Sequence, residues 1–153
     1  MKVQLQVAPT VRRQVSRGLS RAVVRTVASA GRRVGVTDAT LTLRITDDEE
    51  VARLHATFMG LQGPTDVLSF PAEADERSLG DLVIGWGFTV RQSAWRGQGP
   101  LAWQAETIDL ALHGLAHLLG HDHATRHDAR EMLRLERTLA RRAAMPAPVR
   151  PYA

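Results

Sequence analysis

The sequence predicts an α+β fold: a single domain with one roughly four-stranded mixed sheet, packed with about five helices. A length of 153 residues is that of one domain. Apolar residues recur with a period of two in short segments and at helical spacing in longer ones. Along the chain these segments follow the order β α β α β β α α α, which is typical of an α+β domain with one sheet.

The first part of the chain contains two predicted strands, each followed by a helix. Alternating apolar and polar residues predict a half-buried strand over residues 1–7. Apolar residues at helical spacing predict a first helix over 10–30. A second alternating strand covers 40–46, and Thr46 opens a capping-box pattern that predicts a helix over 46–58.

The second part of the chain has two short strands and then only helices. The predicted elements are strands over 67–70 and 80–86, a weak helix after Phe88, a long apolar helix over 101–119 and an Arg/Glu-rich helix over 126–144. We expect residues 1–145 to form the domain and residues 146–153 to form a Pro-rich tail.

The composition excludes several kinds of chemistry. The chain contains no cysteine, which rules out disulfides, cysteine-based zinc sites, iron–sulfur clusters and thiol catalysis, and which suits a reducing cytoplasm. A metal ion must therefore bind His, Asp or Glu. No apolar run approaches the roughly 18 residues of a membrane span, so we expect no membrane partner.

The net charge of +4 is unevenly distributed. Residues 1–37 hold eight of the 20 basic residues and no acidic one. Four arginines fall at every fourth position and line one edge of the first predicted helix: Arg13, Arg17, Arg21 and Arg25. This edge is either a solvated face or a stripe that contacts the phosphates of RNA, whose binding would then weaken with salt.

Five of the six histidines lie between residues 113 and 127. His113 and His117 are four apart in a helical pattern, so both rings project from one face, one turn apart. Gly120 can adopt positive φ, which turns the chain after the helix and brings His123 back to the same point. The three histidines predict a site for one Zn²⁺ ion at the end of the long helix, with a fourth position left open as in catalytic zinc sites.

This spacing also occurs in the extended zinc motif of metzincin proteases. Those proteases carry a Glu general base directly after the first His, and here that position is Gly114. A metallopeptidase or another metallohydrolase is therefore the less favoured alternative, and another group must move protons. The isolated His55 and His127 are predicted to be ordinary surface or core residues.

Three blocks of sequence resemble the YbeY family of bacterial endoribonucleases. Residues 113–123, HGLAHLLGHDH, are similar to its signature, in which Gly follows the first His. Residues 63–71, GPTDVLSFP, and residues 79–84, LGDLVI, resemble two strands of that family. The blocks occur in the family order, so the resemblance covers essentially the whole chain.

The resemblance implies a cytoplasmic, zinc-dependent endoribonuclease that is selective for single-stranded RNA. It implies a role in the maturation of the 3′ end of small-subunit ribosomal RNA and in ribosome quality control. Its three metal histidines correspond to His113, His117 and His123. Residues 1–145 would then be a metal-dependent hydrolase domain whose partners are single-stranded or ribosomal RNA and the ribosome or its small subunit. No DNA partner is expected, and the oligomeric state is left open.

The chain departs from the family pattern in two places. Met59 and Leu61 stand where the family has Arg and Lys. An Arg there would clamp the scissile phosphate, so either another arginine such as Arg53 or one of the stripe reaches the site, or cleavage is weakened. The second departure is His121 in place of the usual Tyr. As catalytic candidates we take His121 for proton transfer and Asp122 for orienting a ligand. The missing Arg keeps open a non-catalytic RNA-binding ribosome-assembly factor with a zinc site.

Overall fold

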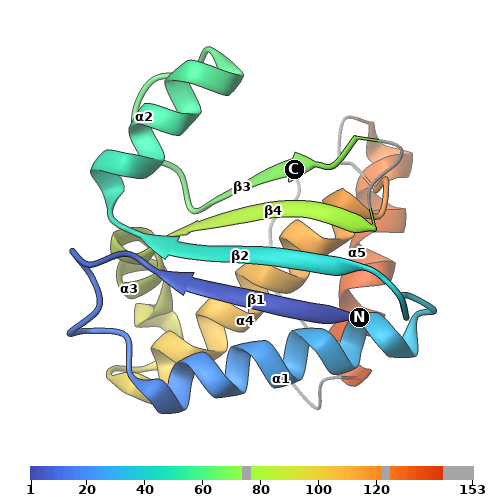
Figure 1. Cartoon of the computed structure of the whole chain (residues 1–153), viewed down its shortest axis with the longest axis horizontal. Helices are drawn as coiled ribbons and strands as arrows, with labels where there is room; N and C mark the ends of the chain where they lie inside the picture. Colours follow the sequence, from blue (N-terminus) through green and yellow to red (C-terminus); the bar gives the residue numbers. More distant parts are fainter. Residues whose placement is uncertain (74–76, 122–124, 143–153) are drawn as a thin grey trace.

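Four strands form one mixed sheet: β1 (Lys2–Val7), β2 (Thr40–Thr46), β3 (Val67–Pro71) and β4 (Ser78–Gly85). Their order across the sheet is β1-β2-β4-β3 (Figure 1). β1 pairs in parallel with β2 and β2 in parallel with β4, whereas β3 runs antiparallel to β4. The computed structural model describes residues 1–73, 77–121 and 125–142. In this part of the chain β1 and β3 are the two edge strands.

Five α-helices and one 3-10 helix lie in the described ranges. They are α1 (Arg17–Arg33), α2 (Asp48–Met59), α3 (Trp86–Gln92), η1 (Ser93–Arg96), α4 (Pro100–Leu118) and α5 (Arg126–Arg142). The predicted α+β class, the mixed four-stranded sheet and the helix number are confirmed. None of the described helices is both long and apolar enough to cross a membrane.

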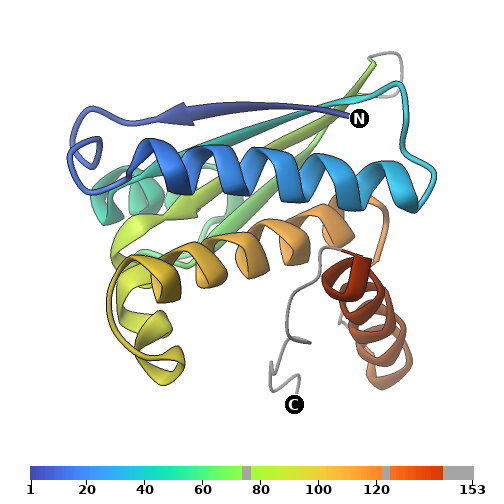
Figure 2. The same ribbon diagram turned by 90° about the horizontal axis from the view of Figure 1, so that it is seen from below.

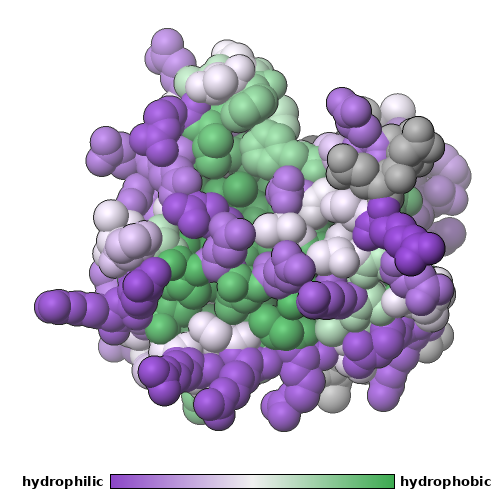
Figure 3. Space-filling view, in the orientation of Figure 1, coloured by the Kyte–Doolittle hydropathy of each residue, from purple (hydrophilic) through white to green (hydrophobic). Residues whose placement is uncertain are grey.

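The helices form layers on the two faces of the sheet. α1 and α4 cover the same face, as Figure 2 shows. The main core lies between them and the sheet, and it includes the fully buried side chains of Leu41, Leu43, Ile45, Leu82 and Ile84. α2 packs on the opposite face through Val51, over Leu68 and Val83. Figure 3 shows this opposite face, where apolar surface gathers around α2.

α4 is the central helix, and its position fixes the residues that it carries. It contacts α1, β3, β4 and α5, and its residues 106–116 are all buried. Two of these are acidic, and both bind Arg96, which places a guanidinium nitrogen 2.8 Å from Glu106 and another 3.0 Å from Asp109. A helix held between these four elements cannot rotate freely, so its side chains project in fixed directions.

The first helix begins later than predicted. Residues 10–15 form turns, and α1 starts at Arg17 behind the N-cap Ser16, whose hydroxyl oxygen accepts a hydrogen bond from the N–H of Leu19 at 3.0 Å. Val11 and Val15 lie before the helix, but both side chains are buried in the core. Their burial explains why apolar residues occur there at a spacing that resembles a helix. Arg13 therefore lies outside the helix, which corrects its predicted place in the stripe.

The N-cap of α2 is Asp47 rather than Thr46. The Asp47 carboxylate accepts hydrogen bonds from the Thr10 hydroxyl and the Glu50 N–H, and these hold its pKa below the usual 3.8. Thr46 remains in β2, and its hydroxyl donates to Glu50. The guanidinium of Arg44 lowers the pKa of Glu50 most strongly. The hydrogen bond from Thr46 lowers this pKa further, whereas burial of the carboxyl raises it, and the net pKa lies below the usual 4.5. These contacts attach the start of α2 to the sheet.

Other boundaries differ by a few residues. β4 begins at Ser78 rather than at residue 80, because its first residue pairs with Thr40 before a register shift. The helix expected after Phe88 begins at Trp86, directly behind β4. The predicted tail, 146–153, lies outside the described residues.

Candidate metal centre

His113 and His117 project from the same side of α4. Their ring centroids are 4.8 Å apart and the ring planes are perpendicular, at 90°. His113 is only 9% exposed, and its neighbours Leu112 and Leu115 are buried in the core. The predicted pairing of these two rings on one helical face is therefore present, and two imidazole nitrogens can approach a common point.

Glu136 on α5 holds the ring of His113. Glu136 is 1% exposed, and its carboxylate forms a hydrogen bond with Nδ1 of His113. An ionised carboxylate can only accept, so Nδ1 is the donor in this pair, and in the neutral ring Nε2 then keeps the lone pair that a metal ion requires. Carboxylate–histidine pairs of this kind are the usual support of zinc-binding histidines.

Sequence reasoning missed Glu136. A signal was present, because Glu136 follows the fully buried Met132 by four residues and so lies on the apolar side of α5. A carboxylate on a buried stripe needs a hydrogen-bonding partner, and His113 of α4 supplies one. The sequence does not show that α5 packs against α4.

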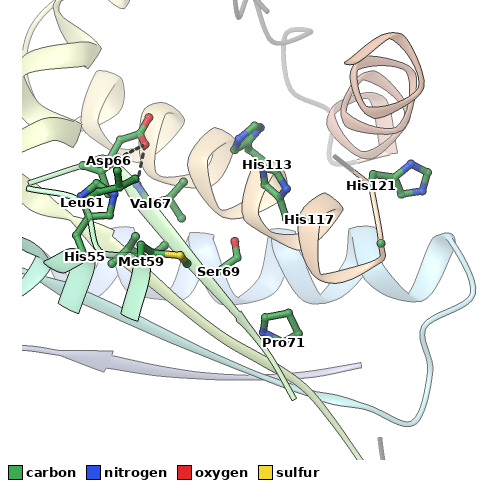
Figure 4. A pocket seen from close by; sticks show the side chains of 13 residues that line it. His55, Met59, Leu61, Asp66, Val67, Ser69, Pro71, His113, His117 and His121 are labelled. Atoms are coloured by element: carbon green, nitrogen blue, oxygen red, sulfur yellow. Dashed lines mark hydrogen bonds between the residues drawn. The ribbon is translucent and has the colours of Figure 1, made fainter. Parts of the chain in front are cut away.

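A cleft of about 510 Å³ opens in front of the two histidines. One wall is α4 with its following turn, and the other is the edge strand β3 (Figure 4). The end of α2 and its loop close the third side. The lining residues are His55, Met59, Leu61, Thr65, Asp66, Val67, Leu68, Ser69, Pro71, His113, His117, Gly120 and His121. No Lys or Arg is among these described residues, so Met59 and Leu61 give the cleft an apolar rim.

Two polar residues of the β3 wall form hydrogen bonds with neighbouring groups. The Asp66 carboxylate accepts a hydrogen bond from the Val67 N–H at 2.8 Å and from Gln92 at 3.4 Å. The hydroxyl of Ser69 donates to the carbonyl of Gly114 at 3.5 Å, which brings the strand against the helical turn that carries His113. His55, predicted to be an ordinary residue, also lines the cleft, where its Nδ1 lies 2.9 Å from the carbonyl of Gly63.

The turn after α4 has the predicted glycine conformation. Gly120 has φ of 89°, and the N–H of His121 donates to the carbonyl of Ala116 at 3.1 Å. His121 lines the cleft, and in Figure 4 its ring points away from those of His113 and His117. Asp122 and His123 lie outside the described residues. Within the described ranges no three His, Asp or Glu side chains form a metal-binding group, so the third ligand stays a prediction.

Gly114 explains why no glutamate can follow the first histidine. A Cβ at this position would lie 2.7 Å from Cδ2 of Leu82, a fully buried residue of β4. The position therefore faces the sheet and not the cleft. A glutamate side chain at this position would start toward β4 rather than toward the cleft, and the metallopeptidase stays the less favoured alternative.

The arginine stripe lies at the other edge of the sheet. Arg17, Arg21 and Arg25 are exposed on α1, and the last two border a hollow with Leu5 and Val7 of β1. β1 and β3 are opposite edges, so these arginines do not line the cleft with His113. RNA binding by the stripe, including Arg13, stays a prediction.

Arg53 does not lie among the cleft residues either. Its charge helps to lower the pKa of both Asp47 and Glu50, which places it near the start of α2, whereas Met59 is the last residue of that helix.

Comparison with known proteins agrees with this arrangement. The family model described as Endoribonuclease YbeY matches residues 8–144. The endoribonuclease YbeY of Chelativorans sp. is 36% identical over 140 residues, which cover 88% of this chain and 83% of that protein. Its counterpart in Bifidobacterium animalis subsp. lactis is 41% identical over 112 residues, which cover 67% of this chain and 60% of the relative.

A solved structure shares the fold. The solution structure of a Thermotoga maritima protein superimposes with a TM-score of 0.51 at 16% identity, and the match covers 97% of this chain and 99% of that one. The family model begins directly after β1 and covers β2, β3 and β4, α4 with its two histidines and α5 with Glu136. The chain therefore belongs to the endoribonuclease YbeY family.

Proposed function

We propose that this chain is a zinc-dependent, cytoplasmic endoribonuclease that cuts single-stranded RNA. We propose that it acts in the maturation of the 3′ end of small-subunit ribosomal RNA and in ribosome quality control. Its partner would be the ribosome or the small subunit. The family membership and the names of the relatives support the activity. The observation that carries the proposal is the pair of His113 and His117 in an open cleft, with Glu136 orienting one ring.

The donor set fits one zinc ion. His113 and His117 offer imidazole nitrogens from one helical face, and Glu136 selects the tautomer of His113 that leaves Nε2 for a metal. His123 would be the third ligand. Zinc, when bound, supplies a Lewis acid that activates water or polarises the scissile phosphate.

The residues of the chain would act around this point. The turn that carries His113 would hold the scissile phosphate beside the two histidines, with Ser69 fixing the width of the cleft through Gly114. His121, which lines the cleft, would transfer a proton after its ring turns inward. Asp122 would orient a ligand. The apolar rim of Met59 and Leu61 would contact a base rather than a phosphate.

The decisive experiment compares zinc-loaded protein with a His117→Ala variant on a single-stranded RNA. We expect cleavage by the first and none by the second, while circular dichroism shows that both are folded. His127→Ala is the matched control, because His127 is exposed on α5 and pairs only loosely with Glu131, at 3.5 Å. Intact RNA with every protein would overturn the nuclease and favour the zinc-containing assembly factor.

A further inference from the structure

The edge strand β3 presents backbone groups that β4 does not use. The N–H of Gly85 donates to the carbonyl of Asp66 at 2.8 Å, and the N–H of Ala72 donates to the carbonyl of Leu79 at 3.4 Å. In an antiparallel pair the residues that exchange hydrogen bonds alternate along the strand. Residues 66, 68, 70 and 72 therefore face β4, and the N–H and C=O groups of the residues between them point out of the sheet.

These outward groups lie in the cleft of the histidines. Val67, Ser69 and Pro71 all line it, and in the described residues no other strand pairs with this edge. The N–H of Val67 already donates to the Asp66 carboxylate, and proline has no N–H. The remaining outward groups are the carbonyl of Val67, the N–H and the carbonyl of Ser69, and the carbonyl of Pro71, so Ser69 supplies the donor of the array with an acceptor next to it.

We propose that the N–H and carbonyl of Ser69 bind the Watson–Crick edge of an unpaired nucleobase next to the scissile phosphate. Each RNA base carries a neighbouring donor and acceptor on that edge, so the strand would accept different bases. In a duplex the same groups are occupied by the complementary base. The proposal rests on the proposed function, and it gives the selectivity for single-stranded RNA a physical origin.

The rest of the cleft suits a base at this position. Met59, Leu61 and Pro71 supply apolar contact for the faces of a planar ring, and no described lining residue is a Lys or Arg that would attract phosphate to this wall. The contact between Ser69 and Gly114 places the array next to the turn of His113. A base held on β3 therefore leaves its own phosphate beside the histidines.

The test replaces Ser69 with proline, which removes the N–H and leaves the pairing with β4 intact, because proline is tolerated on an edge strand whose N–H faces outward. Ser69→Ala is the matched control, since it keeps the N–H and removes only the hydroxyl. Fluorescence anisotropy would measure the affinity of the full chain for oligouridine and oligoadenosine, alone and annealed to their complements. Zinc-loaded and chelator-treated protein would both be measured, so that binding is read with and without turnover.

We expect Ser69→Pro to bind the single strands about tenfold more weakly than Ser69→Ala, with duplex binding unchanged. Equal affinities of the two variants would overturn the proposal while leaving the nuclease itself in place. Wild-type protein that neither binds nor cuts RNA would overturn both.

A second measurement does not depend on the folding of the proline variant. Wild-type protein is tested on oligoadenosine that carries N1-methyladenosine, whose Watson–Crick edge is blocked, and on a 7-deazaadenosine control, whose edge is intact. We expect binding to fall about tenfold with the methylated base only. Equal binding of the two oligonucleotides would overturn the proposal.

Discussion

The Nδ1 of His113 and the carboxylate of Glu136 are joined by a buried hydrogen bond that links α4 to α5. The two residues are 23 positions apart, and neither side chain can move far, because Glu136 is 1% exposed and His113 9%. The bond connects the last described helix to the candidate metal centre. The same hydrogen bond therefore holds α5 against α4 and orients the ring of His113.

Replacing Glu136 with Gln should weaken zinc binding by about 10-fold to 100-fold, because the ring of His113 loses its negatively charged acceptor and part of its basicity. Zinc affinity is measured by competition with a chromophoric chelator, and the tautomer of His113 by nitrogen NMR of the metal-free protein. Glu131→Gln is the control, since Glu131 is half exposed on the same helix. Unchanged affinity and tautomer in Glu136→Gln would contradict the positioning role.

Gly114→Ala should destabilise the protein although it adds a good helix former. The new Cβ would lie 2.7 Å from Leu82, whose side chain is fully buried, and such overpacking costs about 1–3 kcal/mol. The higher helix propensity of alanine offsets up to about 1 kcal/mol of this loss in unfolding free energy. Urea denaturation measures the difference in unfolding free energy.

Gly18→Ala is the matched control for this prediction, because Gly18 is an exposed helical glycine at which the new Cβ would lie 3.8 Å from Oγ of Ser16, an ordinary van der Waals contact. It should stabilise by about 0.5–1 kcal/mol. In a Leu82→Ala background the cost of Gly114→Ala should shrink. If Gly114→Ala were as favourable as Gly18→Ala, α4 would not be packed closely on β4.

The sequence predicts the fold well where one pattern dominates. The alternation in β1 and β2 and the apolar run of α4 gave correct elements, because one-sided or complete burial imposes a single periodicity. The start of α1 was wrong, because Val11 and Val15 are buried at helical spacing inside a turn that the Ser16 cap separates from the helix.

The site was predictable only where its residues share one element. The pair of His113 and His117 follows from helical geometry alone. The role of Glu136 could not be derived, since it depends on how α5 packs against α4. The position of the arginines at the opposite edge follows from the strand order, which periodicity does not determine.

Low pH should weaken the contacts that attach the start of α2 to the sheet and so lower the unfolding free energy. The hydrogen bond from Thr10 to Asp47, and the Arg44 guanidinium beside Glu50, lower the pKa of each carboxyl below its usual 3.8 and 4.5. A pKa that is lower in the folded state adds stability above the unfolded value, and this stability is lost as pH falls through the folded value. The unfolding free energy should therefore drop below about pH 4.5, and Asp47→Asn with Glu50→Gln should flatten that drop.

Urea denaturation at several pH values measures this dependence. Glu49→Gln is the control, because Glu49 is exposed in the same helical turn. Asp47→Ala should in addition cost about 1 kcal/mol at neutral pH through loss of the N-cap. If the unfolding free energy of the double variant falls at low pH as steeply as that of the wild type, other carboxyl groups control acid unfolding.

The arginines of α1 should affect the salt dependence of RNA binding, if the RNA extends beyond the cleft to the β1 edge. Replacing Arg17, Arg21 and Arg25 with Gln should then reduce the slope of log K against log salt by about 0.7 for each lost phosphate contact. Binding titrations between low and moderate salt measure the slope. Arg130, Arg134 and Arg137 on α5 are also exposed, and replacing them changes the net charge equally. The same slope for both triple variants would indicate that the arginines of α1 form a solvated face and make no specific contact with RNA.

Met59→Arg tests whether the apolar rim limits cleavage. Met59 is the last residue of α2, is 45% exposed and lines the cleft of His113, so an arginine there can extend over the open space without displacing the core. A guanidinium would attract the scissile phosphate and offset charge that develops in the transition state, and we expect kcat/KM for single-stranded RNA to rise about tenfold or more. Phe58→Arg is the control, because Phe58 is also exposed on this helix but does not line that cleft. An equal gain in both variants would reflect general attraction of RNA, whereas no gain with Met59→Arg would show that the phosphate is neutralised without help from this wall.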